Sequence, residues 1–368
     1  MSETKVVLAS VLKPVDDSRT YEKIGYSLSQ TKKYEVNIIG FEAKNITLVL
    51  PNINLYPAFN FNRLSVRRVI APFTCLKYYL NSRPDVIIFN THELILVSVL
   101  YKLLFGTRLC YDVRENYYRN IKYGKGFPSV FRGLLAGYVR AKEYLSRSWI
   151  DHYFIAEENY EKEFIFTLKK STVIQNKFHN IHGVSKVKKR GYTNLIFSGT
   201  LGETTGIFQA IDLAKSLHKI EPNIQLKIMG RAAQKSTLTK IKKEIENYSW
   251  ISLIGGDILV NHSLIIEAIS KADLGLICYP KNKSTEGSIP TKLYEYLALE
   301  LPILLEHNPS WEQVCSPYSA SVNINFTNFN PQDLWQEINR HEFYISRPGP
   351  EVEWPSEAEK LIHILNTI

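Results

Sequence analysis

The sequence predicts an α/β protein built from two doubly wound parallel sheets, each covered by helices. Three observations support this fold class. Apolar runs rich in β-branched residues recur at spacings that leave room for a helix between them. A basic, turn-rich break at 183–194, without apolar periodicity, divides these runs into two series. The chain of 368 residues is also longer than the roughly 250 to 300 residues at which single cores stop growing.

The two series of predicted strands define two domains, an N-terminal one at 1–185 and a C-terminal one at 190–345. A last helical segment is expected at 350–368. In chain order the strands are KVVLAS, EVNIIGF, DVIIFN, RLCYDV, DHYFIA and STVIQN, then NLIFSG, IQLKIMG, WISLIGG, ADLGLICYP and LPILLE. Ligands of open α/β sheets bind at the carboxyl ends of strands and at the helix N-termini beside them. We therefore expect one central cleft faced by both domains.

Charge is unevenly distributed along the chain. Residues 1–185 hold 26 Lys+Arg against 16 Asp+Glu, whereas 186–368 hold 19 against 20. Two segments of the first half, 62–80 and 117–148, mix Arg and Lys with Tyr, Phe and Leu. This composition is typical of a surface that contacts an anionic membrane. Core helices whose basic side chains extend to solvent would have the same composition. No nucleic-acid reading module is recognisable, so nucleic acid is not an expected partner.

Other features of the composition predict a soluble, cytoplasmic chain, with peripheral contact to the inner face of the plasma membrane as an option. No apolar stretch approaches the roughly 18 residues needed to span a bilayer, and no export signal is evident at the N-terminus. The four cysteines lack C-x-x-C spacing, which predicts reduced, packed thiols. We expect neither a metal nor a cofactor.

The segment PTKLYEYLALELP at 290–302 places a glutamate inside an apolar helical pattern. Pro290 suits a first helical turn, where its missing N–H costs nothing. Amides of Gly287, Ser288, Thr291 and Lys292 are expected to form an anion site at the positive end of the helix dipole. Glu295, about one turn further on, could accept hydrogen bonds from two vicinal hydroxyls such as those of a ribose.

This segment resembles the P-x-K-x-x-E-Y-x-A-x-G-x-P helix of the retaining nucleotide-sugar glycosyltransferases of family 4, which have the GT-B fold. The resemblance extends to SVLKPVDDSRTYEKIGYSL, RPDVIIFNTHE, YDVRENYY and NLIFSGTLGETTGIFQAIDLAKSL, in the family's order. EVEWPSEAEKLIHIL resembles the final helix that returns to the first domain. The resemblance implies transfer of a sugar from a nucleotide-diphosphate donor, with retention of configuration and without a metal.

The resemblance also assigns candidate site residues. Donor-binding candidates are Gly199, Thr200, Thr205, Arg231, Ser288, Thr291, Lys292 and Glu295. Catalytic candidates are Arg114, Glu115 and Glu286, and acceptor or sugar contacts are Asp17, Arg19, His92 and Asp112. For Asp112, Arg114 and Glu115, at the end of the fourth predicted strand, a salt-bridged loop cluster is the alternative. For His92 the alternative is a structural hydrogen bond.

Several positions depart from the family pattern. Thr200 and Thr205 stand where the family usually has the Arg and Lys that grip the diphosphate, so Arg231 and Lys292 are the substitute cations. Gly287 stands where a second glutamate is usual, and Glu286 is one residue away. Arg114 replaces a common histidine.

The sequence therefore predicts a glycosyltransferase whose acceptor is a polysaccharide precursor or lipid-linked glycan. Two alternatives stay open. An epimerase of the same fold would need acidic and histidine catalysts, and a non-catalytic homologue that binds a partner would explain the missing Arg and Lys.

Overall fold

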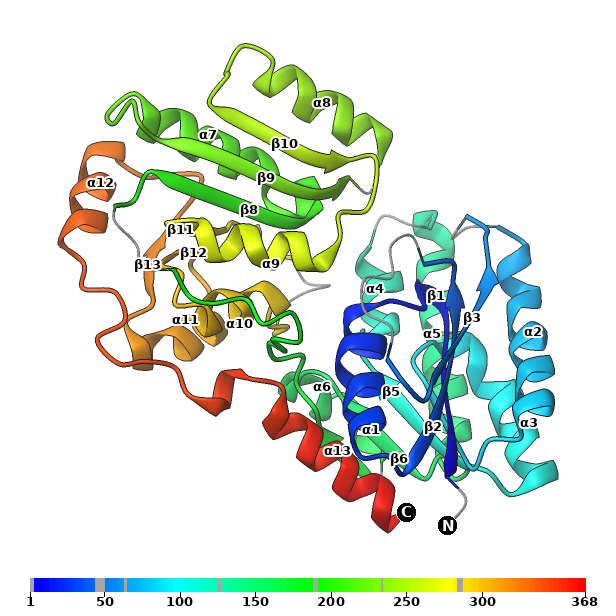
Figure 1. The fold of residues 1–368 in the computed structure, drawn as a ribbon. Coiled ribbons are helices and arrows are strands. Elements are labelled where there is room, and N and C mark those ends of the chain that lie inside the picture. The colour runs from blue at the N-terminus through cyan, green and yellow to red at the C-terminus, as the bar shows by residue number, and fades with distance from the viewer. Residues whose placement is uncertain are drawn as a thin grey trace. The chain divides into compact units, whose positions relative to one another are not determined.

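The computed structural model describes residues 3–368 except 44–49, 63–64, 125–126, 168, 188–190, 233 and 283–286. The chain divides into two compact units. Unit 1 comprises 1–179, 283–288 and 354–368, and unit 2 comprises 180–282 and 289–353. Each unit is an α/β body around its own parallel sheet (Figure 1).

The sheet of unit 1 has, among the described residues, seven strands in the order β3-β2-β1-β4-β5-β6-β7. Every neighbouring pair is parallel. The strands are β1 (Thr4–Pro14), β2 (Tyr34–Phe41), β3 (Ile53–Phe59), β4 (Val86–Phe89), β5 (Arg108–Val113), β6 (His152–Ile155) and β7 (Ser171–Val173). The order reverses direction between β1 and β4, which is the switch point where open parallel sheets place ligands.

Alternate residues of these strands are buried on opposite faces of the sheet. Val7 and Ile87 pack with α2 and α3, whereas Val6 and Ile88 pack with the helical segment after β1. The helices are α1 (Tyr26–Gln30), α2 (Arg67–Ser82), α3 (Ile95–Phe105), α4 (Tyr117–Tyr123), α5 (Ser129–Ser146) and α6 (Glu158–Glu161). Short 3-10 turns lie at η2 (His92–Leu94) and η3 (Ile165–Thr167). A π-helix, η1 (Ser18–Gly25), precedes α1; such helices are rare and concentrate at functional sites.

The last helix, α13 (Pro355–Thr367), belongs to unit 1 and lies beside α1 in Figure 1. Trp354, Leu361 and Leu365 are buried in the same core cluster as β1 and β2. The Trp354 indole donates to Ser27 Oγ at 2.8 Å, and the Trp354 amide donates to Phe178 O at 2.7 Å. Both ends of the described chain therefore contribute to one core.

Unit 2 repeats the architecture with a parallel sheet in the order β10-β9-β8-β11-β12-β13. Its strands are β8 (Asn194–Leu201), β9 (Gln225–Ala232), β10 (Ile251–Gly256), β11 (Leu274–Ile277), β12 (Ile303–Glu306) and β13 (Ser321–Ile324). Its helices are α7 (Ile207–His218), α8 (Lys235–Ile245), α9 (His262–Lys271), α10 (Thr291–Ala298), α11 (Pro309–Cys315) and α12 (Pro331–Arg340), with 3-10 turns η4 (Glu203–Thr205), η5 (Ser316–Tyr318) and η6 (Pro350–Val352).

The predicted α/β class with two parallel sheets is confirmed. Two strands, β3 and β13, were not predicted. Both are edge strands, and both are only partly buried. Pro57 inside β3 and the polar Ser321 and Asn323 in β13 hide them from a search for continuous apolar runs, since edge strands tolerate such residues.

Candidate functional site

Glu295 is held in the interior of unit 2 by a histidine from another helix. Its side chain lies on α10 and is 9% exposed, and its Oε1 atom lies 3.1 Å from His262 Nε2, within hydrogen-bonding distance. His262 is the first residue of α9, whose N-cap Asn261 accepts a hydrogen bond from the Ser263 amide. The carboxylate is thus fixed in direction by a donor 33 residues away in the sequence.

Lys292, one turn before Glu295, is a buried cation. Its ammonium donates to the carbonyl oxygen of Ser198 in β8. It also lies 4.7 Å from the centre of the Phe197 ring and 5.2 Å from that of Tyr279. Among the described residues no carboxylate forms an ion pair with Lys292. A buried ammonium without a carboxylate partner is costly for folding and favourable for an anionic ligand.

Three glycines lie side by side where β8, β9 and β10 end. Gly199 pairs with Gly230, and Gly230 pairs with Gly255. All three have positive φ, at +99°, +151° and +93°. A Cβ on Gly230 would stand 1.7 Å from Gly199 O, and one on Gly255 would stand 2.4 Å from Gly230 O. This glycine row keeps side chains away from the sheet edge beside Lys292, whose Nζ would lie 3.5 Å from a Cβ on Gly199.

The two threonines in the diphosphate positions have different surroundings. Thr205 Oγ1 accepts from the Gly202 amide at 3.1 Å and lies 2.7 Å from Thr200 O, so the loop itself uses this hydroxyl. Thr200 is opposite Arg231 in the β8–β9 register, and Arg231 is exposed. Arg231 is therefore a cation available at the same sheet edge as the glycine row.

The helix that carries Lys292 starts later than predicted. Pro290 is the N-cap with extended backbone (ψ 131°), and Thr291 is the first helical residue, rather than Pro290 itself. The Gly287 carbonyl accepts from Asn159 Nδ2 at 2.9 Å, and Gly287 and Ser288 are grouped with unit 1. Glu286 lies outside the described residues.

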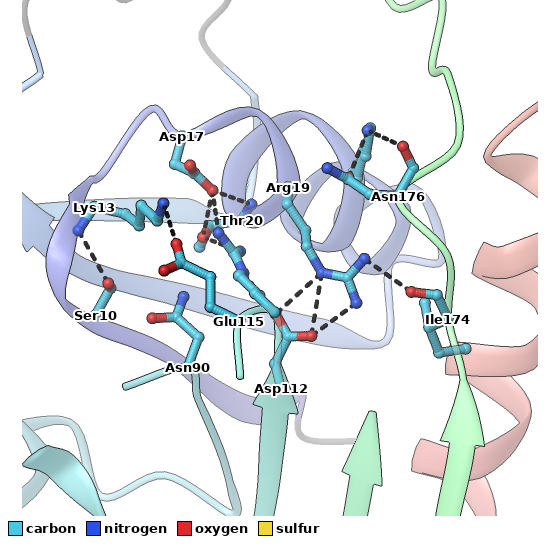
Figure 2. Close-up of polar contacts among 12 residues, drawn as sticks. Ser10, Lys13, Asp17, Arg19, Thr20, Asn90, Asp112, Glu115, Ile174 and Asn176 are labelled. Carbon is cyan, nitrogen blue, oxygen red and sulfur yellow. Dashed lines mark hydrogen bonds and ion pairs between the residues drawn. The ribbon is translucent and has the colours of Figure 1, made fainter. Parts of the chain in front are cut away.

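Three of the four acceptor-side candidates, Asp17, Arg19 and Asp112, form a network of ion pairs with the catalytic candidate Arg114 (Figure 2). Arg19 binds Asp112 through Nε and Nη2, at 3.1 and 2.7 Å, and donates through Nη1 to Ile174 O at 2.9 Å. Arg114 donates to Asp112 at 2.8 Å, to Asp17 at 2.5 Å and to Thr20 Oγ1 at 2.6 Å. The loop after β1, the π-helix and the end of β5 are thereby joined.

Electrostatics fix both carboxylates of this network in the charged form. Burial would raise the pKa of Asp112, but Arg19 and Arg114 together hold it below its ordinary value. Burial likewise opposes ionisation of Asp17, and Arg114 and Lys13 overcome it, so the pKa of Asp17 is lowered. With its N–H groups donating to Asp112, Asp17 and Thr20, Arg114 joins these loops, which was the alternative left open for this cluster.

Glu115 and His92 complete the predicted set. Glu115 is half-exposed and pairs with Lys13 at 3.0 Å (Figure 2). His92 is mostly buried beside Lys142, whose Nζ lies 3.0 Å from His92 Nδ1, and Glu93 lies 3.5 Å from Nε2. Burial lowers the pKa of His92 to about 4, so the ring is neutral at pH 7. If Lys142 donates to Nδ1, the neutral ring carries its hydrogen on Nε2.

Comparison with known proteins gives a family match for part of the chain. Residues 181–342 match the family model described as glycosyl transferases group 1. This part of the chain is a glycosyl transferases group 1 domain. The match contains Glu295, Lys292, His262 and the glycine row. No curated protein sequence matches the chain.

Solved structures resemble the whole chain in fold. Sucrose-phosphate synthase from Thermosynechococcus elongatus has a TM-score of 0.72 at 12% identity and covers 99% of each chain. Anabaena HepE in complex with UDP and glucose has a TM-score of 0.68 at 11% identity and covers 100% of each chain. A putative UDP-N-acetylglucosamine 2-epimerase from Listeria monocytogenes has a TM-score of 0.57 at 10% identity, covering 100% of this chain and 96% of its own. The glycosyl transferases group 1 domain thus belongs to a chain with the GT-B fold.

Sequence reasoning missed two features of the glycosyl transferases group 1 domain. His262 was not predicted because its partner Glu295 is remote in the sequence and nothing local in VNHS marks it. Gly230 and Gly255 had a visible signal, since FSG, IMG and IGG each end a predicted strand with glycine. Aligning those three endings would have indicated the glycine row.

Proposed function

We propose that the protein transfers a sugar from a nucleotide-diphosphate donor to a polysaccharide precursor or lipid-linked glycan, with retention of configuration and without a metal. Lys292 carries the proposal, because it is a buried cation beside a glycine-lined sheet edge. A diphosphate there would supply the missing negative charge. The solved complexes of HepE with UDP and glucose, and of a trehalose protein from E. coli with UDP-2-fluoro glucose, make UDP the first nucleotide to try.

In this proposal the residues of unit 2 hold the donor. Glu295, oriented by His262, accepts hydrogen bonds from the ribose hydroxyls. Lys292, Arg231 and the amides of Thr291 and Lys292 at the start of α10 stabilise the charge that develops on the leaving diphosphate. An oxygen of that diphosphate then takes the proton of the acceptor hydroxyl, so no pair of carboxylates is needed for proton transfer.

The acceptor side is assigned to unit 1. Glu115 is the half-exposed carboxylate of the network, whereas Asp17, Arg19, Asp112 and Arg114 position the loops around it. The basic N-terminal half favours an acceptor presented at an anionic membrane on the cytoplasmic side.

A nucleotide screen tests the donor assignment. UDP, GDP, ADP and CMP are added to the purified chain, and thermal shift and calorimetry report binding. One nucleotide should stabilise the chain, and Glu295→Ala should weaken the binding of that nucleotide about 10- to 150-fold, since hydrogen bonds to charged groups contribute about 1.5–3 kcal/mol. Glu267→Ala, on an exposed glutamate of α9, is the matched control and should bind normally.

Absence of a response to every nucleotide would contradict the proposal and favour the non-catalytic homologue. Equal binding by the Glu295→Ala and Glu267→Ala variants would remove Glu295 from the donor site.

A further inference from the structure

The outer face of three helices in unit 1 exposes large apolar side chains in helical stripes. On α5, Val130, Leu134, Tyr138 and Leu145 are 84%, 74%, 58% and 67% exposed. At 3.6 residues per turn they fall within an arc of about 80°. The stripe runs the length of the helix, while Val139, Glu143 and Ser146 are buried on the other side. The side of α5 that faces solvent, which would be polar in an ordinary surface helix, is therefore apolar.

The same feature continues over α2 and α3. These two helices and α5 form one layer: α3 packs against both α2 and α5, and Tyr111 from the sheet face under α2 and α3 donates to Glu143 of α5. Figure 1 shows all three helices in unit 1. The exposed apolar side chains of α2 and α3, with the N-cap of α2, are Val66, Val69, Ile70, Phe73, Leu80, Leu96, Leu100, Leu103, Leu104 and Phe105. We call this surface the α2–α3–α5 face.

Exposed apolar side chains are rarer and more scattered in unit 2. On its helices, Leu264 of α9 is the only large one among the described residues. Single exposed apolar residues are normal in soluble proteins, but a continuous surface of this kind marks an interaction site.

The α2–α3–α5 face is also basic. Its exposed cations include Arg67 and Lys77, and Lys77 lies within the apolar stripe of α2. Neither α2 nor α3 contains an acidic residue, and the single acid of α5, Glu143, is buried. A twofold contact between two copies would bring these like charges together. Anionic headgroups would instead neutralise them.

We propose that the α2–α3–α5 face docks on a lipid bilayer that contains anionic lipids. The apolar stripes enter the boundary between headgroups and acyl chains, and Arg67 and Lys77 contact lipid phosphates. None of the described helices is long and apolar enough to cross a bilayer. The inference rests on the proposed function for its purpose, since a lipid-linked acceptor would be presented at that surface, but not for its test.

Cosedimentation with vesicles tests this docking. Vesicles of phosphatidylcholine with phosphatidylglycerol should bind the full-length protein, and pure phosphatidylcholine vesicles should bind it more weakly. Leu134→Asn/Leu145→Asn should lower the partition coefficient at least tenfold, because each substitution removes an apolar side chain that would be buried in the bilayer. Arg67→Ser and Lys77→Ser should each lower it about fivefold on anionic vesicles. Ile258→Asn/Leu264→Asn, with two exposed apolar side chains of unit 2, is the matched control and should bind like the wild type.

Three results would overturn the inference: no binding to anionic vesicles, equal binding by the α5 variant and its control, or a dimer in light scattering that the α5 variant abolishes. Light scattering and a thermal melt of each variant establish that it is folded. The nucleotide screen on the same samples separates the two proposals. Vesicle binding without a nucleotide response would refute the donor site alone, and a nucleotide response without vesicle binding would refute the docking face alone.

Discussion

Replacing Lys292 by methionine should weaken nucleotide binding without destabilising the protein. Methionine keeps an unbranched, apolar side chain in the buried position and removes the ammonium. The change also removes one hydrogen bond to Ser198 O and the contacts with the Phe197 and Tyr279 rings. It leaves Glu295 and His262 in place.

The two expected effects have different sizes. Desolvation of a buried ammonium costs several kcal/mol, whereas the lost hydrogen bond is worth about 1.5–3 kcal/mol and the cation–π contacts about 1–2 kcal/mol. These terms nearly cancel, so we expect the unfolding free energy without nucleotide to change by less than about 1 kcal/mol. A diphosphate that loses its charged partner should lose about 1.5–3 kcal/mol, which is a 10- to 150-fold weaker Kd.

Calorimetry with the nucleotide found in the screen measures the Kd, and a thermal melt without nucleotide measures the stability. Lys271→Met, on an exposed lysine of α9, is the matched control and should change neither. A variant that lowers Tm by many degrees yet binds nucleotide like the wild type would refute the reasoning, because Lys292 would then be a structural residue.

Three further predictions concern stability. Asp17 and Asp112 have lowered pKa values in the folded chain, so the stability they contribute is present above their ordinary pKa of 3.8 and is lost as the pH falls below it. Tm should therefore decrease when the pH is lowered below about 4. Asp112→Asn should cost about 3–5 kcal/mol at pH 7 and should make that decrease smaller. Burial raises the pKa of Glu143 to about 7, so stability should fall as pH rises from about 4.5 to 7, and Glu143→Gln should remove this slope and raise Tm at pH 8; an unchanged slope would contradict it. Gly230→Ala would put a Cβ against Gly199 O and should cost about 2–5 kcal/mol in a chemical melt, whereas Gly191→Ala, which meets nothing within 4 Å, should stay within about 0.5 kcal/mol.

Sequence patterns predicted the sheets well because parallel strands buried on both faces are continuous apolar runs. KVVLAS and DVIIFN are examples, and both lie at the centre of the sheet of unit 1 as β1 and β4. The π-helix after β1 had no such signal. Its geometry is accompanied by tertiary contacts of Arg19 and Thr20, which only the folded chain brings to Asp112 and Arg114.

The candidate site was predictable only in part, for a related reason. The helical pattern of 290–302 and the family resemblance singled out Lys292 and Glu295, and residue types near strand ends singled out the acidic and basic residues of unit 1. Which of them pair with each other depends on distances across the fold, such as the 93 residues between Arg19 and Asp112. The sequence therefore named the charged groups, but not that Arg114 would be occupied by Asp17, Thr20 and Asp112.

The packing of α13 into unit 1 has a consequence for synthesis on the ribosome. Unit 2 lies between residues 179 and 354 of the chain, so it is an insertion within unit 1. The sheet face that Trp354, Leu361 and Leu365 cover stays open until those residues have left the exit tunnel. Unit 1, whose sheet is synthesised first, therefore completes its core only after the whole of unit 2 has been made.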